Sequence, residues 1–157
     1  MDKLRTTLAT LAATALTASL GAAAVAAEDE APADDQMVGV YSIEGMTWLL
    51  TGLLVDGEMV ELPDGAIVSL RLEDGDAGGN GGCNSYFTTY TVDGDSISVD
   101  PTIGQTMMAC PSDEHSEQAR AYIVALTNAA TWSIDASGNL ELRDEGGALQ
   151  VGYVSAE

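Results

Sequence analysis

Basic residues are scarce in this chain. Its 157 residues include five lysines and arginines against 25 aspartates and glutamates, which gives a formal charge of −20. Lys3 is the only lysine, and from residue 28 onward the basic residues are Arg71, Arg120 and Arg143. A field of this sign repels phosphate backbones and anionic lipid headgroups, so we expect no nucleic acid partner. High solubility or a saline medium explains the acidity most simply; a basic partner or bound divalent cations are the alternatives.

Histidine and cysteine are equally rare. One histidine, His115, and two cysteines, Cys83 and Cys110, are available for nucleophilic chemistry or metal binding. A cysteine nucleophile needs a base and a group that orients the base, and we expect His115 to face solvent in the first turn of a helix. A structural zinc site needs four ligands, usually including closely spaced cysteines. We therefore predict that the protein is not an enzyme and has no catalytic residue, metal or cofactor.

The N-terminal 27 residues have the composition of a secretory signal peptide. A short basic start precedes an uncharged, alanine-rich run, and cleavage is expected after Ala26 or Ala27. A membrane anchor is the alternative, because the uncharged run is long enough to cross a bilayer. No cysteine lies near the cleavage sites, so a lipid-anchored form is not supported. We predict a periplasmic or secreted protein without a membrane anchor after cleavage.

The two cysteines are predicted to form a disulfide. An even number of cysteines in an exported chain indicates pairing in an oxidising compartment. In the loop-entropy model, a bond between Cys83 and Cys110 is worth about 3 to 4 kcal/mol, a large share of the stability of a small domain.

The rest of the chain has the length of one domain. Residues 28–40 are predicted to be an acidic, disordered leader, because they have few apolar side chains, and residues 41–157 to be the folded part. Alternating apolar residues and turn dipeptides predict about eight short strands. These are residues 48–55, 58–62, 66–72, 84–92, 96–99, 131–135, 140–143 and 148–154.

Two further expectations concern the faces and connections of these strands. Residues 48–55 are apolar at successive positions, which is typical of a strand covered on both faces. Residues 73–82 are rich in glycine and are expected to form a solvated loop. This loop fits neither a calcium site, since Gly78 and Ser85 occupy two ligand positions of an EF-hand, nor a phosphate-binding loop.

One helix is expected at residues 113–128. Ser112 suits the N-cap, and acids follow it in the first turn. An apolar stripe recurs at the helical spacing i, i+3, i+4, i+7, formed by Ala119, Tyr122, Ile123 and Leu126. The stripe needs a sheet to pack against, so the predicted class is an antiparallel α+β domain.

The order of several short motifs resembles the META domain family, which includes the bacterial heat-shock protein HslJ. The resemblance covers residues 41–154 and rests on Trp48, Gly82, Cys83, Asn84, Tyr86, Tyr90, Thr106, Met108, Ala109 and Cys110. It implies an antiparallel sheet wrapped around a single helix, in envelope-located or secreted proteins linked to heat and envelope stress. Thr88 departs from the glycine that many members have there. Because no catalytic template fits, we interpret these signature residues as structural.

The leading functional hypothesis is a non-enzymatic exported domain that acts in stress tolerance by binding another molecule. One alternative is a carrier of a small apolar or lipid-like ligand within the core between sheet and helix. Another is a protein-interaction or inhibitor module that uses exposed loops such as residues 73–82. We expect a monomer, and we expect five large apolar side chains to be core and not cofactor contacts: Met107, Met108, Trp132, Tyr86 and Tyr122.

Overall fold

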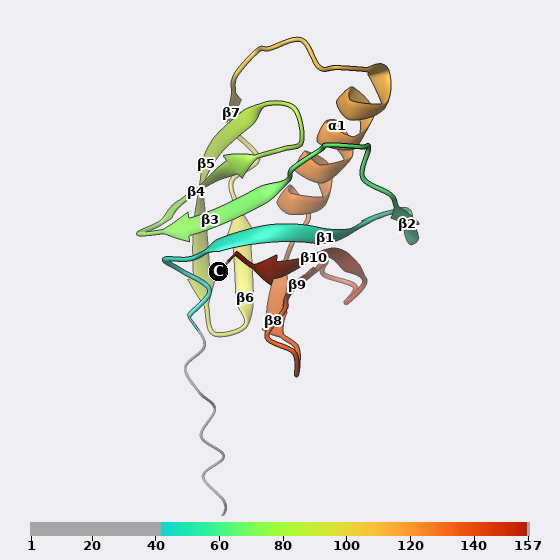
Figure 1. The fold of residues 1–157 in the computed structure, drawn as a ribbon. Coiled ribbons are helices and arrows are strands. Elements are labelled where there is room, and N and C mark those ends of the chain that lie inside the picture. Colours follow the sequence, from blue (N-terminus) through green and yellow to red (C-terminus); the bar gives the residue numbers. More distant parts are fainter. Residues whose placement is uncertain (1–41, 157) are drawn as a thin grey trace, which may run out of the picture. The chain divides into compact units, whose positions relative to one another are not determined.

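The computed structural model describes residues 42–156 (Figure 1). The predicted signal peptide and the acidic leader lie outside the described residues. Within residues 42–156, no helix is long and apolar enough to cross a membrane. This part of the chain has ten strands and one helix, α1 (Asp113–Thr127), and every strand pair is antiparallel. The predicted antiparallel α+β class is confirmed.

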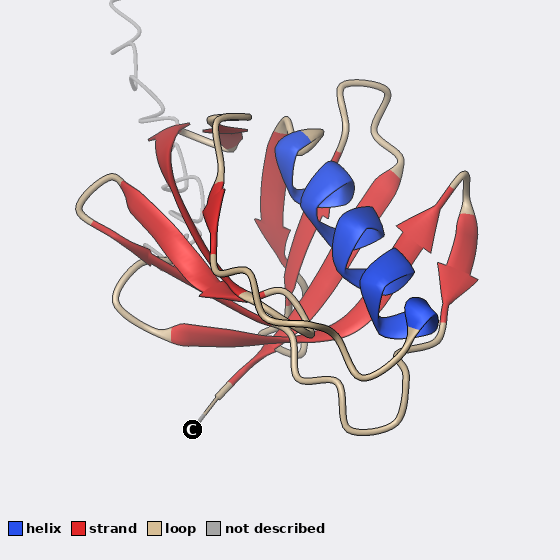
Figure 2. Cartoon of the chain, turned by 90° about the horizontal axis from the view of Figure 1, so that it is seen from above, coloured by secondary structure: helices blue, strands red, loops and turns tan. Residues whose placement is uncertain are grey.

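Eight of the strands form a closed sheet. The order is β10-β9-β8-β6-β5-β4-β3-β1, and β1 also pairs with β10; β2 extends from β1, and β7 pairs with β5. The helix packs against β1, β10 and β6 and lies across the sheet (Figure 2). The strands are β1 (Thr47–Val55), β2 (Glu58–Val60), β3 (Ser69–Glu73), β4 (Asp76–Asn80), β5 (Ser85–Asp93), β6 (Ser96–Val99), β7 (Gly104–Gln105), β8 (Thr131–Ile134), β9 (Leu140–Arg143) and β10 (Leu149–Ser155).

The strand β1 is covered on one face, so the expectation of two covered faces was wrong. Trp48, Leu50 and Leu53 are buried, whereas Leu49 and Leu54 are half-buried. The pairing of β1 with β10 shifts register between residues 50 and 52. A bulge of this kind inserts an extra residue and re-aims the side chains that follow. It brings Leu50 and Leu53 to the same inner face despite their odd spacing.

The predicted loop at residues 73–82 is largely a strand, which corrects that expectation. Asp74 and Gly75 have φ values of 51° and 89°, as a two-residue hairpin turn requires, and they connect β3 to β4. The strand β4 is paired on both sides, with β3 and with β5. Glycine has low strand propensity, so no local pattern predicts this strand. Backbone pairing with two neighbours holds this segment in the sheet.

The exposure of the large apolar side chains confirms part of the predicted core. Tyr86 and Tyr122 are buried as expected, and Trp132 is half-buried. Met107 and Met108 are exposed, so their assignment to the core was wrong. Both lie in the segment that follows β7, outside the sheet. Hydrogen bonds between the side chain of Asn84 and the backbone of Met108 hold this segment in place, so the Met108 side chain does not need to pack.

Three buried tyrosine hydroxyls form a row between the helix and the sheet. Tyr86 donates to the backbone oxygen of Ser69 at 3.0 Å, and its oxygen lies 2.8 Å from that of Tyr122. The hydroxyl of Tyr122 lies 3.1 Å from that of Tyr153. A phenol has one proton, so Tyr122 donates to Tyr86 and Tyr153 donates to Tyr122. Burial raises the pKa of all three hydroxyls well above the ordinary value, which keeps these protons in place.

The direction of this row predicts unequal effects of removing each hydroxyl. Tyr86→Phe leaves the proton of Tyr122 without an acceptor and the oxygen of Ser69 without a donor. Tyr153→Phe removes only the terminal donor. We expect a loss of about 1 to 3 kcal/mol in the free energy of unfolding for Tyr86→Phe and the smallest loss for Tyr153→Phe. Urea denaturation measures both, and equal losses would contradict the assigned direction.

Candidate binding groove beside the disulfide

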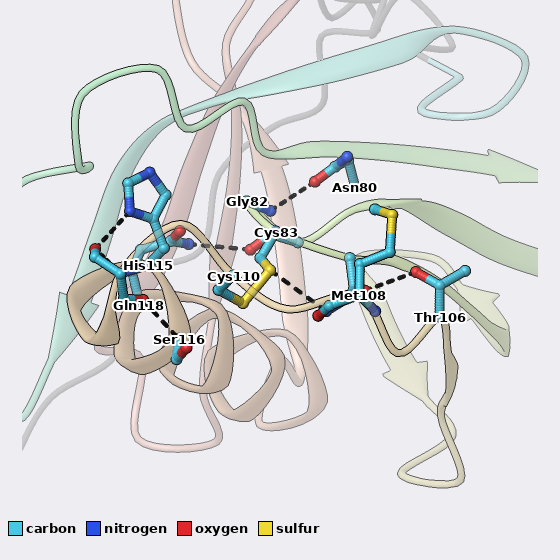
Figure 3. The surroundings of a disulfide bond; sticks show 12 residues. Asn80, Gly82, Cys83, Thr106, Met108, Cys110, His115, Ser116 and Gln118 are labelled. Carbon is cyan, nitrogen blue, oxygen red and sulfur yellow. Dashed lines mark hydrogen bonds between the residues drawn. A yellow bond between two sulfur atoms is a disulfide. The ribbon is translucent and has the colours of Figure 1, made fainter.

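A disulfide joins the residues just before β5 to the segment that leads into α1. The sulfur atoms of Cys83 and Cys110 are bonded, with their Cα atoms 5.4 Å apart and 27 positions apart in sequence (Figure 3). The predicted disulfide is therefore confirmed. Since the chain has only these two cysteines, it has no thiol for nucleophilic or metal chemistry.

Asn84 fixes the segment that precedes the second cysteine. Its side-chain oxygen accepts hydrogen bonds from the backbone N–H of Met108 at 2.8 Å and from the hydroxyl of Thr106 at 2.9 Å. Its amide nitrogen donates to the backbone oxygen of Met108 at 3.2 Å. The hydroxyl of Thr106 also accepts from the N–H of Ser85 at 3.1 Å. The predicted signature residues Asn84, Thr106 and Met108 are thus brought together to hold this segment on β5.

Gly82 lies where the chain crosses the helix. Its φ is 103°, and a Cβ at this position would lie 2.1 Å from the side-chain oxygen of Gln118, so glycine is required on both grounds. Gln118 is buried and donates to the backbone oxygen of Gly81 at 3.2 Å, while its own oxygen has no hydrogen-bond partner among the described residues. Gln118 was not predicted. Its only sequence signal is its place four residues before Tyr122.

Two of the signature aromatic residues, Trp48 and Tyr90, contact the segment before β1. Trp48 is buried and its indole nitrogen donates to the backbone oxygen of Ile43 at 2.9 Å. Tyr90 is buried and donates to the carboxylate of Glu44. Burial, followed by the contact with Glu44, raises the pKa of Tyr90 to about 12. Both side chains tie the segment before β1 to the sheet, which is a structural role.

Two signature positions behave differently from the rest. Ala109 is exposed, and nothing in the structure explains its place in the signature. Thr88 pairs with Ala77 in regular strand geometry, and its hydroxyl donates to the backbone oxygens of Asp100 at 2.8 Å and Thr102 at 3.2 Å. Threonine in place of the family's glycine therefore adds side-chain hydrogen bonds, and the backbone at residue 88 has ordinary strand geometry.

His115 takes part in the helix cap. The hydroxyl oxygen of Ser112 accepts a hydrogen bond from the backbone N–H of His115. The same oxygen lies 2.9 Å from Nδ1 of the His115 ring. Ser112 is the N-cap, as predicted. The half-buried imidazole is thus engaged locally, and among the described residues no acidic side chain is hydrogen-bonded to it. A serine–histidine pair without an orienting group is not a catalytic triad.

A groove of about 510 Å³ lies next to the disulfide. It is lined by Asn84, Gln105, Cys110, Ser116, Ala119, Arg120, Ile123 and Val124. The predicted apolar stripe of α1 is therefore divided between two sides. Tyr122 and Leu126 point into the core, whereas Ala119 and Ile123 face this groove. The groove is open to solvent and half apolar.

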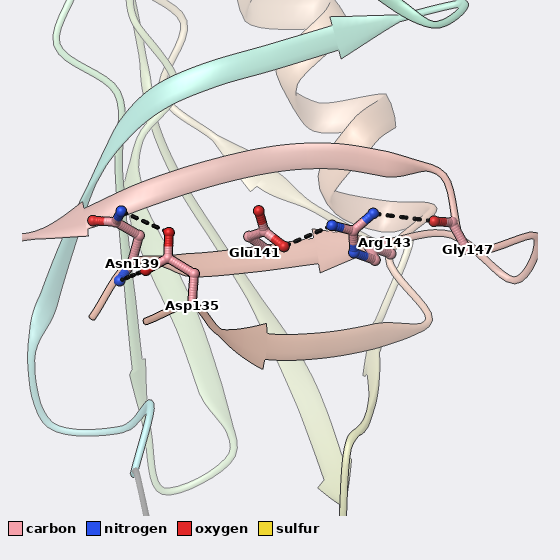
Figure 4. Close-up of polar contacts among 5 residues, drawn as sticks. All are labelled: Asp135, Asn139, Glu141, Arg143 and Gly147. Atoms are coloured by element: carbon pink, nitrogen blue, oxygen red, sulfur yellow. Dashed lines mark hydrogen bonds and ion pairs between the residues drawn. The ribbon is translucent and has the colours of Figure 1, made fainter. Parts of the chain in front are cut away.

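The charge of the groove sets it apart from the rest of the molecule. Arg71 pairs with Glu73 at 3.1 Å, and Arg143 pairs with Glu141 at 2.7 Å (Figure 4). Arg120 pairs with no carboxylate of residues 42–156. No carboxylate lines the groove, whereas three other surface hollows each include at least one. In a chain with 25 acids, this groove is suited to an apolar group that carries negative charge.

Comparisons with known proteins agree with this fold. A family model described as the META domain matches residues 41–154. A solved NMR structure of a protein from Burkholderia xenovorans is 25% identical, with a TM-score of 0.59, and the match covers 73% of this chain and 83% of that one. A second solved NMR structure is 16% identical, with a TM-score of 0.52, and the match covers 71% of this chain and 89% of that one. No curated protein matches.

Proposed function

Because the chain belongs to the META domain family, which matches over residues 41–154, we propose that it is an exported, non-enzymatic domain that acts in envelope or extracellular stress tolerance by binding. The disulfide supports export, since it is compatible with an oxidising compartment. The absence of a free thiol and the local engagement of His115 support the non-enzymatic assignment. In this proposal the sheet encloses the inner face of α1 and the signature residues stabilise the fold.

The groove beside the disulfide is the proposed binding site. Its volume of about 510 Å³ lies within the range of small-molecule sites, roughly 300 to 1,000 Å³. Ala119, Ile123 and Val124 supply apolar contact, and Arg120 supplies a positive charge at the same wall. The ligand that fits is a small amphiphile whose apolar chain ends in a carboxylate. The observation that carries this assignment is an arginine in a hollow without carboxylates.

Binding in this groove differs from the predicted carrier site inside the core. The interior between sheet and helix is occupied by Tyr86, Tyr122, Tyr153 and Leu126, all of them buried. A ligand there would have to displace these side chains and break the tyrosine row. Close-packed interiors resist such displacement, so we place the ligand at the surface.

Replacing Arg120 tests the proposed ligand class. We expect dodecanoate, below its micelle-forming concentration, to bind saturably, and Arg120→Gln to weaken its binding about tenfold or more, because a hydrogen bond to a charged group contributes about 1.5 to 3 kcal/mol. Isothermal titration calorimetry measures both affinities. Arg71→Gln is the matched control, since Arg71 already pairs with Glu73 and does not line the groove. Equal losses in the two variants, or no saturable binding by the unmodified protein, would contradict the proposal.

A protein partner is the second candidate. Met107, Met108 and Val124 are exposed apolar side chains on the disulfide-linked segment and the adjacent helix. Flexible methionines are common on adaptable protein-binding surfaces. Photo-crosslinking from residue 107 in the native host would capture one defined partner if this surface docks a protein. A crosslinker at residue 58, at the tip of the β1–β2 hairpin, is the control.

A further inference from the structure

The methionines of the described chain all lie at the surface. The exposed fractions are 98% for Met107, 64% for Met108, 63% for Met59 and 37% for Met46. Methionine is normally among the residues that are most often fully buried. Here the buried core consists of leucine, isoleucine, valine, alanine and aromatic side chains. No methionine in residues 42–156 is therefore needed to fill the core.

The chain also lacks the side chain that oxidants usually attack first. Both cysteines are in the disulfide, so the protein has no free thiol. Oxidation follows thiolate character and exposure, and the methionine thioether is the other sulfur group that readily takes up oxygen. Trp48 is buried, and Trp132 is half-buried. Exposed thioethers are therefore the most accessible reducing groups of the described residues.

The segment that carries Met107 and Met108 is held by groups that oxidation of these sulfurs does not touch. Asn84 binds the backbone N–H and backbone oxygen of Met108, and Cys110 anchors the end of the segment through the disulfide. The side chain of Met107 is almost fully in solvent. A polar sulfoxide at either sulfur is therefore compatible with the fold, unlike a sulfoxide in a packed core.

We propose that Met107 and Met108 are an oxidation site at which the protein consumes neutral two-electron oxidants without losing its fold. The substrate class is hydrogen peroxide and undissociated hypochlorous acid, because the charge of −20 repels small anionic oxidants, which have no apolar chain whose burial would offset the repulsion. With peroxide, the thioether sulfur gives two electrons, the O–O bond breaks, one oxygen joins the sulfur and water leaves. With hypochlorous acid, the sulfur again gives two electrons, the O–Cl bond breaks, the oxygen ends on the sulfur, and chloride and a proton leave. Methionine sulfoxide reductases can restore the thioether.

Peptide-resolved mass spectrometry of the full exported protein, with the disulfide intact, tests this site. Treatment with less than one equivalent of hypochlorous acid, and separately of hydrogen peroxide, should form sulfoxide at Met107 roughly threefold faster than at Met46, in line with exposure. Met46 is the internal control, and Met59, which is 63% exposed, should react about as fast as Met108, which is 64% exposed. Separate peptides distinguish all four from Met37. Exhaustive oxidation should leave the melting temperature unchanged in the variant Met46→Leu/Met59→Leu, whose remaining described methionines are Met107 and Met108.

Two results would overturn the proposal. One is oxidation of Met107 and Met108 no faster than that of Met46. The other is unfolding of the Met46→Leu/Met59→Leu variant as Met107 and Met108 are oxidised, because these side chains would then have a structural role.

The variant Met107→Leu/Met108→Leu supplies the remaining control. It should consume less oxidant than the unmodified protein at the same melting temperature, and undiminished consumption would count against the site. The reaction does not require the groove to be occupied, so failure of ligand binding and failure of oxidation are distinguishable.

Discussion

Replacing Cys83 with serine is expected to lower the free energy of unfolding by about 3 to 4 kcal/mol. The bond closes a loop across 27 positions and joins β5 to the only helix of the described chain. Cys110→Ser should cost the same, because either change removes the same crosslink. The double variant should be no less stable than either single variant, since the two residues act as one unit.

Urea denaturation of the three variants measures this equivalence. Addition of reductant to the unmodified protein is the control, and it should give the same loss without any substitution. Losses that add in the double variant would mean that the two side chains pack independently. In that case the disulfide would not be the main connection between β5 and α1.

Gly79→Ala is expected to be the most damaging small substitution in the sheet. A Cβ at this position would lie 2.1 Å from the backbone oxygen of Ser69 and 2.7 Å from its carbon. These atoms belong to β3 and cannot rotate away, and the same oxygen accepts the hydroxyl of Tyr86. We expect a loss at or above the upper end of the roughly 1 to 3 kcal/mol typical of overpacking.

Gly52→Ala is the matched control for this prediction. Gly52 also lies in a strand, but a Cβ there would meet the sulfur of Met59 at 3.3 Å, the mobile end of an exposed side chain. Its cost should be small, because Met59 can move. Thermal denaturation compares the two variants. Similar melting temperatures for both would contradict a close backbone contact between β3 and β4.

The helix and most strands could be predicted because their signals are local. Ser112 and the acids after it mark the start of α1, and Asp56-Gly57 marks the turn between β1 and β2. The strand β4 could not be predicted in the same way. Its glycines carry no apolar pattern, and their strand conformation comes from backbone pairing with β3 on one side and β5 on the other.

The candidate site was predictable in part. The pairing of Cys83 with Cys110 follows from cysteine count and compartment, and the structure contains the bond. The burial of Met107 and Met108 was wrongly predicted, because an apolar side chain does not reveal that its segment is held through backbone contacts to Asn84. The groove is lined by helix residues that are not fully covered by the core. Ala119 and Ile123 follow the same helical spacing as the buried Tyr122, so the sequence pattern could not distinguish groove-lining residues from core residues.

The most direct test of the binding account is a map of where an anionic amphiphile contacts the domain. Two-dimensional NMR during titration with dodecanoate should show saturable shifts of the backbone signals of Ala119, Ile123 and Val124, with dodecyltrimethylammonium as the oppositely charged control. We predict that these shifts are strongly reduced in Arg120→Gln and with the cationic control. Shifts centred on the core residues Tyr122 and Tyr153, or equal shifts with both amphiphiles, would contradict binding at the groove beside the disulfide.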